Sequence, residues 1–121
     1  MSESDLMRSV MLAVSREGHR VFRHNVAEGW MGDAQVTHHA GGISVYIPHA
    51  RPLHAGLVVG GSDLIGYSKD GRFLAIETKA KRGRLTKEQQ NFLTQVNAAG
   101  GIGIMARSVE EALSALTKPT M

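Results

Sequence analysis

The chain has 121 residues, a length that suits one compact domain and leaves little material for a second core. Hydrophobic residues make up 42% of it and charged residues 21%, proportions that are typical of a globular fold and exclude a disordered chain. Fourteen Lys and Arg against eleven Asp and Glu leave a net charge of +3, which is compatible with a polyanionic partner.

The absence of cysteine excludes disulfides, thiolate nucleophiles and Cys-ligated zinc. No apolar run approaches the roughly 20 residues that a bilayer-spanning helix needs. Residues 1–5 are acidic, whereas a secretory signal begins with basic residues followed by apolar ones. We therefore expect a protein without membrane contact that stays in the compartment where it is made, the cytoplasm.

The first 24 residues predict a helix followed by a short strand. Ser2 or Ser4 can cap the helix, and Gly18 can end it. Apolar residues recur between them at helical spacing, at Leu6, Val10, Ala13 and Val14. Residues 19–24 contain Val21 and Phe22 between polar neighbours, as expected of a short strand.

Residues 25–61 are the least regular part of the chain. Residues 43–47 alternate in polarity as a strand does, and Pro48 and Pro52 follow. We interpret the segment as a loop with one or two strands, or a hairpin, inserted into a single domain of residues 1–121. Its length indicates a functional or mobile insertion.

From Ser62 onward the pattern becomes regular. Strands are predicted at residues 63–67 and 72–79, around a turn at residues 68–71. A capping box begins a helix at Thr86, a strand follows at residues 102–106, and a second capping box begins a last helix at Ser108. This order predicts an α/β fold with a mixed central β-sheet flanked by helices.

Two carboxylates and a lysine can meet on the first pair of these strands. If residues 69–71 form a three-residue loop, Asp63 lies opposite Glu77 on one face, and Lys79 lies two residues beyond. A two-residue turn would instead pair Asp63 with Thr78 and send its carboxylate to the other face. The first register predicts an oxygen-ligand site for a hard cation such as Mg²⁺ or Mn²⁺. The plainer alternative is that Glu77 and Lys79 pair with each other where the strand reaches solvent.

The same residues carry a family resemblance. Ser62-Asp63, Glu77-Thr78-Lys79, Leu85-Thr86-Lys87-Glu88-Gln89 and Gly100-Gly101 resemble the VRR-NUC family, a branch of the PD-(D/E)XK nuclease superfamily. The resemblance extends from about Gly60 to Leu116 and implies a restriction-endonuclease-like α/β sandwich. Ser62 departs from the pattern, since it stands where the superfamily has the proline of its name.

The resemblance implies roles for particular residues. Asp63 and Glu77 would be metal ligands, joined by the backbone carbonyl of Thr78, and Lys79 would position the attacking water or stabilise the phosphate. Gln89 would reach the same site from its helix, although its amide could instead close the capping box. Glu3 corresponds to an acidic residue on the family's first helix and could be a metal ligand, or simply a surface acid that suits the helix dipole.

Basic side chains surround the predicted site in sequence. The run Lys79, Lys81, Arg82, Arg84 and Lys87 predicts contacts to the phosphate backbone of DNA, which carry no sequence information. Arg20 and Arg23 could extend it, and His24 is a further candidate DNA contact. The plainer interpretation of such a run is a solvated face.

The sequence as a whole predicts a Mg²⁺- or Mn²⁺-dependent endodeoxyribonuclease. The family resemblance implies branched DNA such as junctions or flaps as the substrate. We expect a homodimer, because two strands need two active sites. A bacterial or phage-infected cell is the expected setting. The alternatives are a catalytically silent DNA-binding module of the same fold, and an assembly protein whose basic character is incidental.

Overall fold

The computed structural model describes residues 1–117 and divides the chain into two compact units. One unit combines residues 1–24 with residues 57 onward, and the other consists of residues 25–56. Within the described residues, no helix is both long and apolar enough to span a membrane. The two units are described separately.

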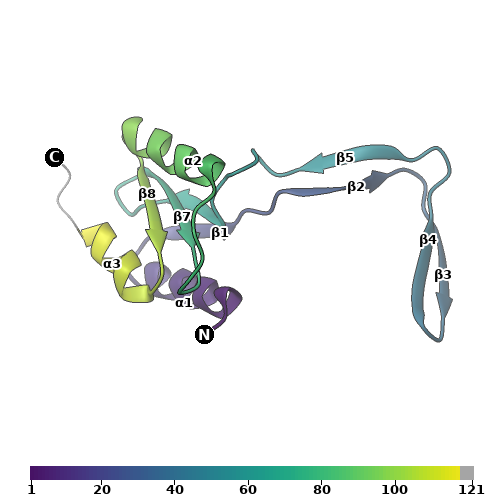
Figure 1. Cartoon of the computed structure of the whole chain (residues 1–121), viewed down its shortest axis with the longest axis horizontal. Helices are drawn as coiled ribbons and strands as arrows, with labels where there is room; N and C mark the ends of the chain where they lie inside the picture. The colour runs from purple at the N-terminus through teal and green to yellow at the C-terminus, as the bar shows by residue number, and fades with distance from the viewer. Residues whose placement is uncertain (118–121) are drawn as a thin grey trace. The chain divides into compact units, whose positions relative to one another are not determined.

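The first unit is built on a four-stranded sheet in the order β1-β6-β7-β8 (Figure 1). β1 (Arg20–Arg23), β6 (Leu64–Tyr67) and β7 (Phe73–Thr78) are antiparallel neighbours, and β8 (Ile102–Ala106) runs parallel to β7. The predicted mixed sheet is therefore confirmed. β7 has a neighbour on each side, and its residues from Leu74 to Thr78 are all buried.

Helices cover both faces of this sheet. α1 (Glu3–Arg16) and α3 (Val109–Thr117) contact each other on one side, whereas α2 (Lys87–Ala98) lies on the other (Figure 1). The core between the sheet and this helix pair contains apolar residues of the sheet and of both helices: Leu6, Val10, Val14, Val21, Leu64, Leu74, Ile76, Ile104, Ala106 and Ala112. The opposite face of β7, toward α2, carries Ala75 and Glu77. The α/β sandwich that the sequence predicts is the observed architecture.

The helix ends follow from capping residues. The Ser2 side chain accepts a hydrogen bond from Asp5 N at 3.1 Å, so Ser2 and not Ser4 caps α1. Gly18, two residues after the helix, adopts a φ of 95° that favours glycine. Thr86 and Gln89 form the predicted capping box at the start of α2. These local predictions are confirmed.

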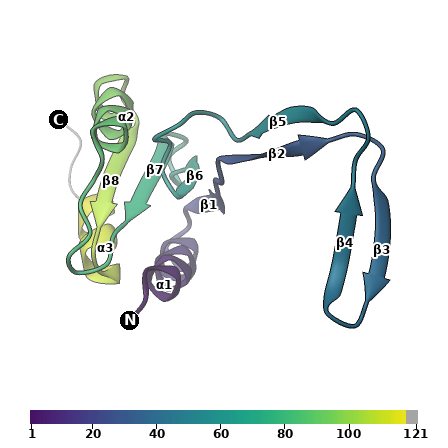
Figure 2. The same cartoon turned by 45° about the vertical axis from the view of Figure 1, so that its right-hand side comes forward.

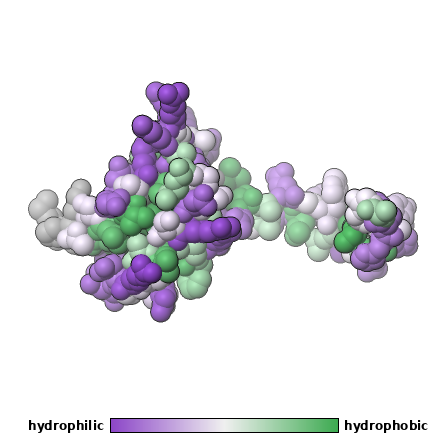
Figure 3. Space-filling view, turned by 90° about the horizontal axis from the view of Figure 1, so that it is seen from below, coloured by the Kyte–Doolittle hydropathy of each residue, from purple (hydrophilic) through white to green (hydrophobic). Residues whose placement is uncertain are grey.

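The second unit contains four strands in two separate pairs. β2 (Ala27–Met31) pairs with β5 (Arg51–Ala55), and β3 (Gln35–His39) pairs with β4 (Gly42–Tyr46), all antiparallel (Figure 2). The segment is thus richer in strands than the one or two strands or single hairpin that the sequence predicts. Every residue of the four strands is exposed, including several apolar ones (Figure 3).

Candidate active site

The β6–β7 hairpin has the register that brings two acids together. Ser68 N donates to Arg72 O at 2.8 Å, and the three residues between them form the loop, with Gly71 at a φ of 84°. Leu64 then pairs with Ile76. One step beyond this pair, at the end of the ladder, lie Asp63 and Glu77. The three-residue loop and its register are as predicted.

Asp63 is bound to β7 through both its backbone and its side chain. Its N–H donates to Glu77 Oε2 at 3.1 Å. Its carboxylate oxygen Oδ2 accepts from Thr78 N at 3.2 Å and from Thr78 Oγ1 at 3.0 Å. The Asp63 carboxylate therefore lies beside the end of β7 and next to the Glu77 side chain.

Glu77 is a buried acid with several partners. Its side chain is 1% exposed, Oε1 accepts from Gln89 Nε2 at 3.0 Å, and the ammonium of Lys79 lies 3.7 Å from the same oxygen. Burial, and to a smaller extent the neighbouring Asp63 charge, raises the pKa of the Glu77 carboxyl from its ordinary 4.5 to about 7. A buried acid that lies beside a second carboxylate forms a site that a cation would stabilise.

Lys79 and Gln89 reach this acid from two elements. Lys79 follows β7, where its N–H donates to Ala106 O at 3.1 Å, and its side chain is 13% exposed. Gln89 does both things that the sequence left open: its Oε1 accepts from Thr86 N at 2.9 Å in the capping box, while its Nε2 donates to Glu77. The capping box thus holds the amide in place for its contact with the acid.

The donor atoms present suit a hard divalent cation. Asp63 and Glu77 supply carboxylate oxygens and Thr78 supplies a backbone carbonyl, the ligand types that Mg²⁺ and Mn²⁺ prefer. Among residues 1–117, no group of three or more His, Asp or Glu side chains is arranged to hold a metal. A divalent cation here would consequently be held by two carboxylates, with backbone and water oxygens as its other ligands. The ligand roles of Asp63, Glu77 and Thr78 stay predictions.

Glu3 lies near this end of β7, but it has a different partner. Its Oε2 accepts from Ala80 N at 3.2 Å, so the first turn of α1 holds the residue that follows Lys79. This contact joins positions that are 77 residues apart in sequence. The ligand role predicted for Glu3 is not tested by it.

Arg107 is a site residue that the sequence analysis missed. Its Nη1 donates to Ala80 O at 2.8 Å and to Lys81 O at 3.4 Å, while its backbone N–H donates to Glu111 Oε2 at 2.7 Å. Glu3 and Arg107 thereby bind the N–H and the C=O of Ala80. A single arginine after an apolar strand carries no pattern, so only the fold could reveal this clamp.

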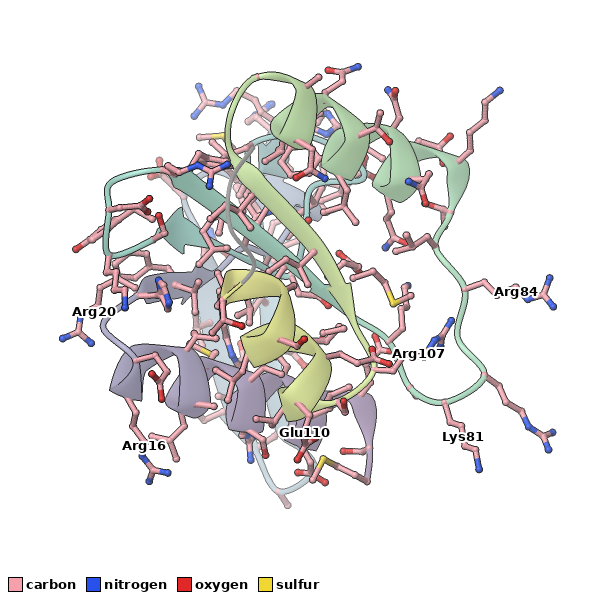
Figure 4. All side chains as sticks on the ribbon, turned by 90° about the vertical axis from the view of Figure 1, so that its left-hand side faces the viewer. Arg16, Arg20, Lys81, Arg84, Arg107 and Glu110 are labelled. Atoms are coloured by element: carbon pink, nitrogen blue, oxygen red, sulfur yellow. The ribbon has the colours of Figure 1, made fainter. Side chains whose placement is uncertain are left out.

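The basic run lies on the loop that follows Lys79, whose first residues are bound by Arg107. Figure 4 shows Lys81 and Arg84 pointing away from the protein body and Arg107 next to the same loop. Lys81, Arg82, Arg84 and Lys87 are exposed, and within the described chain none of them forms an ion pair. Their charges are available to phosphates, and the DNA contacts predicted for them are not tested.

Arg23 and His24 lie at the end of β1, beside Asp63. Arg23 is exposed, and His24 N donates to Asp63 O at 2.7 Å. Both ring nitrogens of His24 are engaged within the chain: Nε2 accepts from Leu57 N at 2.8 Å, and Nδ1 lies 3.2 Å from Ser62 O. Because a carbonyl can only accept, Nδ1 is the protonated nitrogen. The DNA contact predicted for His24 stays a prediction, and its nitrogens already hold the chain next to Asp63.

A family model described as VRR-NUC domain matches residues 43–110, more than half of the chain. The chain belongs to the VRR-NUC family. The matched range contains Asp63, Glu77, Lys79 and Gln89, and excludes Glu3, Arg23 and His24. It begins inside the second unit, earlier than the resemblance seen in the sequence. No curated protein matches the chain.

VRR-NUC membership implies a nuclease of the PD-(D/E)XK type, an enzyme class that typically uses a divalent metal ion. The geometry agrees with this class in its two acids, its lysine and its position at the end of a central strand. Ser62 replaces the proline and is 1% exposed. Among the described residues, its hydroxyl is the buried side-chain group without a hydrogen-bond partner. The difference from the superfamily at position 62 therefore concerns a buried packing position next to the acids, and not one of the acids themselves.

Proposed function

We propose that this VRR-NUC protein is a Mg²⁺- or Mn²⁺-dependent endonuclease that hydrolyses phosphodiester bonds in DNA. The observation that carries the proposal is the cluster at the end of β7, where Asp63, Glu77 and Lys79 share one network of contacts. A divalent cation held by Asp63, Glu77 and the Thr78 carbonyl would activate water and neutralise charge on the phosphate.

The chain's own groups have complementary tasks. Lys79 sits beside Glu77 and can orient the attacking water or donate to a non-bridging phosphate oxygen. Gln89 fixes the orientation of the Glu77 carboxylate. The exposed Lys81, Arg82 and Arg84 can hold the phosphate backbone in register with the site.

Nicking of supercoiled plasmid and of a four-way junction tests the proposal. Wild-type protein should cut with Mg²⁺ or Mn²⁺ and not with EDTA, and Glu77→Ala and Lys79→Ala should each lower the rate by about a thousandfold or more. Glu110→Ala, which removes an exposed acid from α3, is the matched control and should cut at the wild-type rate. Metal-dependent DNA binding without cutting would leave the silent DNA-binding module, and no DNA binding at any salt concentration would leave the assembly protein.

We propose branched DNA as the substrate and the cytoplasm of a bacterial or phage-infected cell as the setting. We also propose that residues 1–121 form a single nuclease domain which residues 25–61 interrupt. In support, the acids, the lysine and the basic loop all belong to the first unit. Junctions, flaps and linear duplexes compared in one cleavage panel would rank the substrates.

We propose that the active form is a homodimer, and the β3–β4 hairpin supports this. Its register places Val36, His38, Ile43 and Val45 on one face, and the three aliphatic side chains are between 52% and 61% exposed. Residues 35–46 contain no Asp, Glu, Lys or Arg, so two copies meeting about a twofold axis would not oppose like charges. Each face is only about 17 Å long, which favours a concentration-dependent dimer.

Analytical ultracentrifugation over a range of protein concentrations tests the dimer. Ile43→Lys should shift the equilibrium to monomer, because it places charge on the apolar face. Thr37→Lys, on the opposite face of the same hairpin, is the matched control and should leave the equilibrium unchanged. A wild-type protein that is monomeric at every concentration would contradict the proposal.

A further inference from the structure

An apolar turn lies directly before the acids and outside every core of the molecule. Leu57, Val58 and Val59 are consecutive, and their side chains are 69%, 48% and 71% exposed. They precede Ser62 and Asp63 by only a few residues, and all belong to the first unit. Three adjacent aliphatic side chains held in water cost free energy, which is unusual in a loop so close to a catalytic cluster.

The turn is held in one conformation by close backbone contacts. Gly61 N donates to Val58 O at 3.1 Å, which closes it. Gly60 has a φ of 84°, and a Cβ there would lie 2.8 Å from the backbone carbon of Glu88 at the start of α2. Gly61 lies against the His24 ring, where a Cβ would be 2.6 Å from Cε1. Both glycines are therefore needed for this close approach to α2 and His24.

His24 ties this turn to the acid. One ring nitrogen accepts from Leu57 N, at the start of the turn, and the other donates to Ser62 O, after it. The backbone N–H of the same histidine donates to Asp63 O. Because one residue binds both ends of the turn and the acid, the apolar side chains keep a fixed position relative to Asp63.

DNA exposes the apolar face of a base pair only where its duplex ends. Along a continuous duplex these faces are covered by stacking, and insertion between stacked bases costs a few kcal/mol per step. At a junction or flap the last base pair is already exposed, so aliphatic side chains can contact it without that cost. A rigid apolar turn beside the acids consequently favours DNA that is branched at the cutting site.

We propose that Leu57, Val58 and Val59 form an apolar wedge that contacts the exposed base pair at a DNA branch and so selects branched DNA. This deepens the proposed nuclease function and rests on it. Phosphate contacts from the exposed basic loop would act on every duplex alike, whereas the wedge gains free energy only at a branch. Discrimination and general affinity thus come from different parts of the first unit.

Binding in EDTA tests the wedge independently of cleavage. A three-way junction with 2-aminopurine at the branch point and a linear duplex of the same sequence are titrated with the full chain. Wild-type protein should raise the 2-aminopurine fluorescence of the junction, because contact with the last base pair unstacks the probe, and should bind the junction about tenfold more tightly than the duplex.

The triple variant Leu57→Ser, Val58→Ser, Val59→Ser should lose the fluorescence change and bind both DNAs with the wild-type duplex affinity. The salt dependence of binding should stay the same, since no phosphate contact is removed. Leu12→Ser replaces another exposed leucine, on α1 and 55% exposed, and is the matched control with wild-type behaviour. A thermal midpoint equal to the wild type would show that the triple variant is folded.

The wedge is overturned if the triple variant keeps both the fluorescence change and the junction preference. It is equally overturned if the variant changes only the oligomeric state, because the turn then contacts protein. A wild type that shows the fluorescence change but never cuts would contradict the proposed nuclease and leave the wedge standing. If the wild type cuts DNA but shows the same preference among substrates as the triple variant, the nuclease proposal stands and the wedge is contradicted.

Discussion

The two units of this chain use their side chains in opposite ways. The first unit buries apolar residues on both faces of β7 and, at the end of that strand, also buries Glu77. The second unit has four strands and not one buried strand residue, with a net charge of −1 from Arg51 against Glu28 and Asp33. Charge can be buried only where a surrounding fold supplies hydrogen bonds, which is why the acids lie in the first unit.

The largest expected effect is a difference between the two units in how much a side-chain truncation lowers the free energy of unfolding. Leu74→Ala removes a fully buried side chain from β7 and should lower the free energy of unfolding by about 2–5 kcal/mol. Ile43→Ala removes a side chain that is 61% exposed, and it should change the value by less than about 0.5 kcal/mol. Urea denaturation at low protein concentration measures both, and equal losses would mean that the second unit has a core of its own.

A pH series should reveal the buried acid. The pKa of Glu77 is raised in the folded protein to about 7, so the native state binds a proton that the unfolded chain releases above about 4.5. The contribution of Glu77 to the free energy of unfolding is therefore complete below pH 4.5 and is lost as the pH rises to about 7. In metal-free protein this loss should be about 2–3 kcal/mol.

The comparison with Glu77→Gln isolates this group, because other groups titrate in the same range. Burial and the nearby Lys69 charge lower the pKa of His19, which gives the opposite slope. The difference in unfolding free energy between wild type and Glu77→Gln should follow the Glu77 slope and shrink when Mg²⁺ is added. A difference that is independent of pH would contradict the raised pKa.

Removing the clamp on the basic loop should have an intermediate effect. Arg107→Ala removes the hydrogen bonds to the carbonyls of Ala80 and Lys81, and it should lower the free energy of unfolding by about 1–3 kcal/mol. Trypsin should then cut after Lys81 and Arg82 faster than in the wild type. Because Nη1 alone makes both contacts, Arg107→Lys, which keeps a charged nitrogen donor, should restore part of the loss. Unchanged proteolysis in Arg107→Ala would show that the loop is held without the clamp.

The smallest expected effect concerns the residue that replaces proline. Ser62→Ala removes a buried hydroxyl that has no partner among the described residues, and it should raise the free energy of unfolding by about 0.5–1 kcal/mol. Thermal unfolding of the two proteins measures this difference. A destabilised Ser62→Ala would mean that the hydroxyl is satisfied, for instance by water.

Much of the first unit could be predicted because its signals are local. The hairpin loop at Lys69–Gly71, the capping box at Thr86 and the alternation of β7 act over a few residues, and together they set the register that brings Asp63 to Glu77. In the second unit the alternation of residues 43–47 predicts a strand that corresponds to β4. The other three strands were harder to predict, because exposed strands need not show the alternation that burial imposes.

The sequence by itself determined the mixed sheet, its helices and the resemblance to a nuclease family, since each depends on neighbours in the chain or on a motif. It offered the Asp63–Glu77 register as one of two, and the hairpin of the folded chain has that register. Only the tertiary structure decided which groups the side chains of Glu3, His24 and Arg107 contact, because these groups lie between 26 and 77 residues away. Contacts over such separations exist only after the core has closed, and no pattern along the chain records them. Leu57–Val59 likewise acquired a position beside the acid only through the ring of His24.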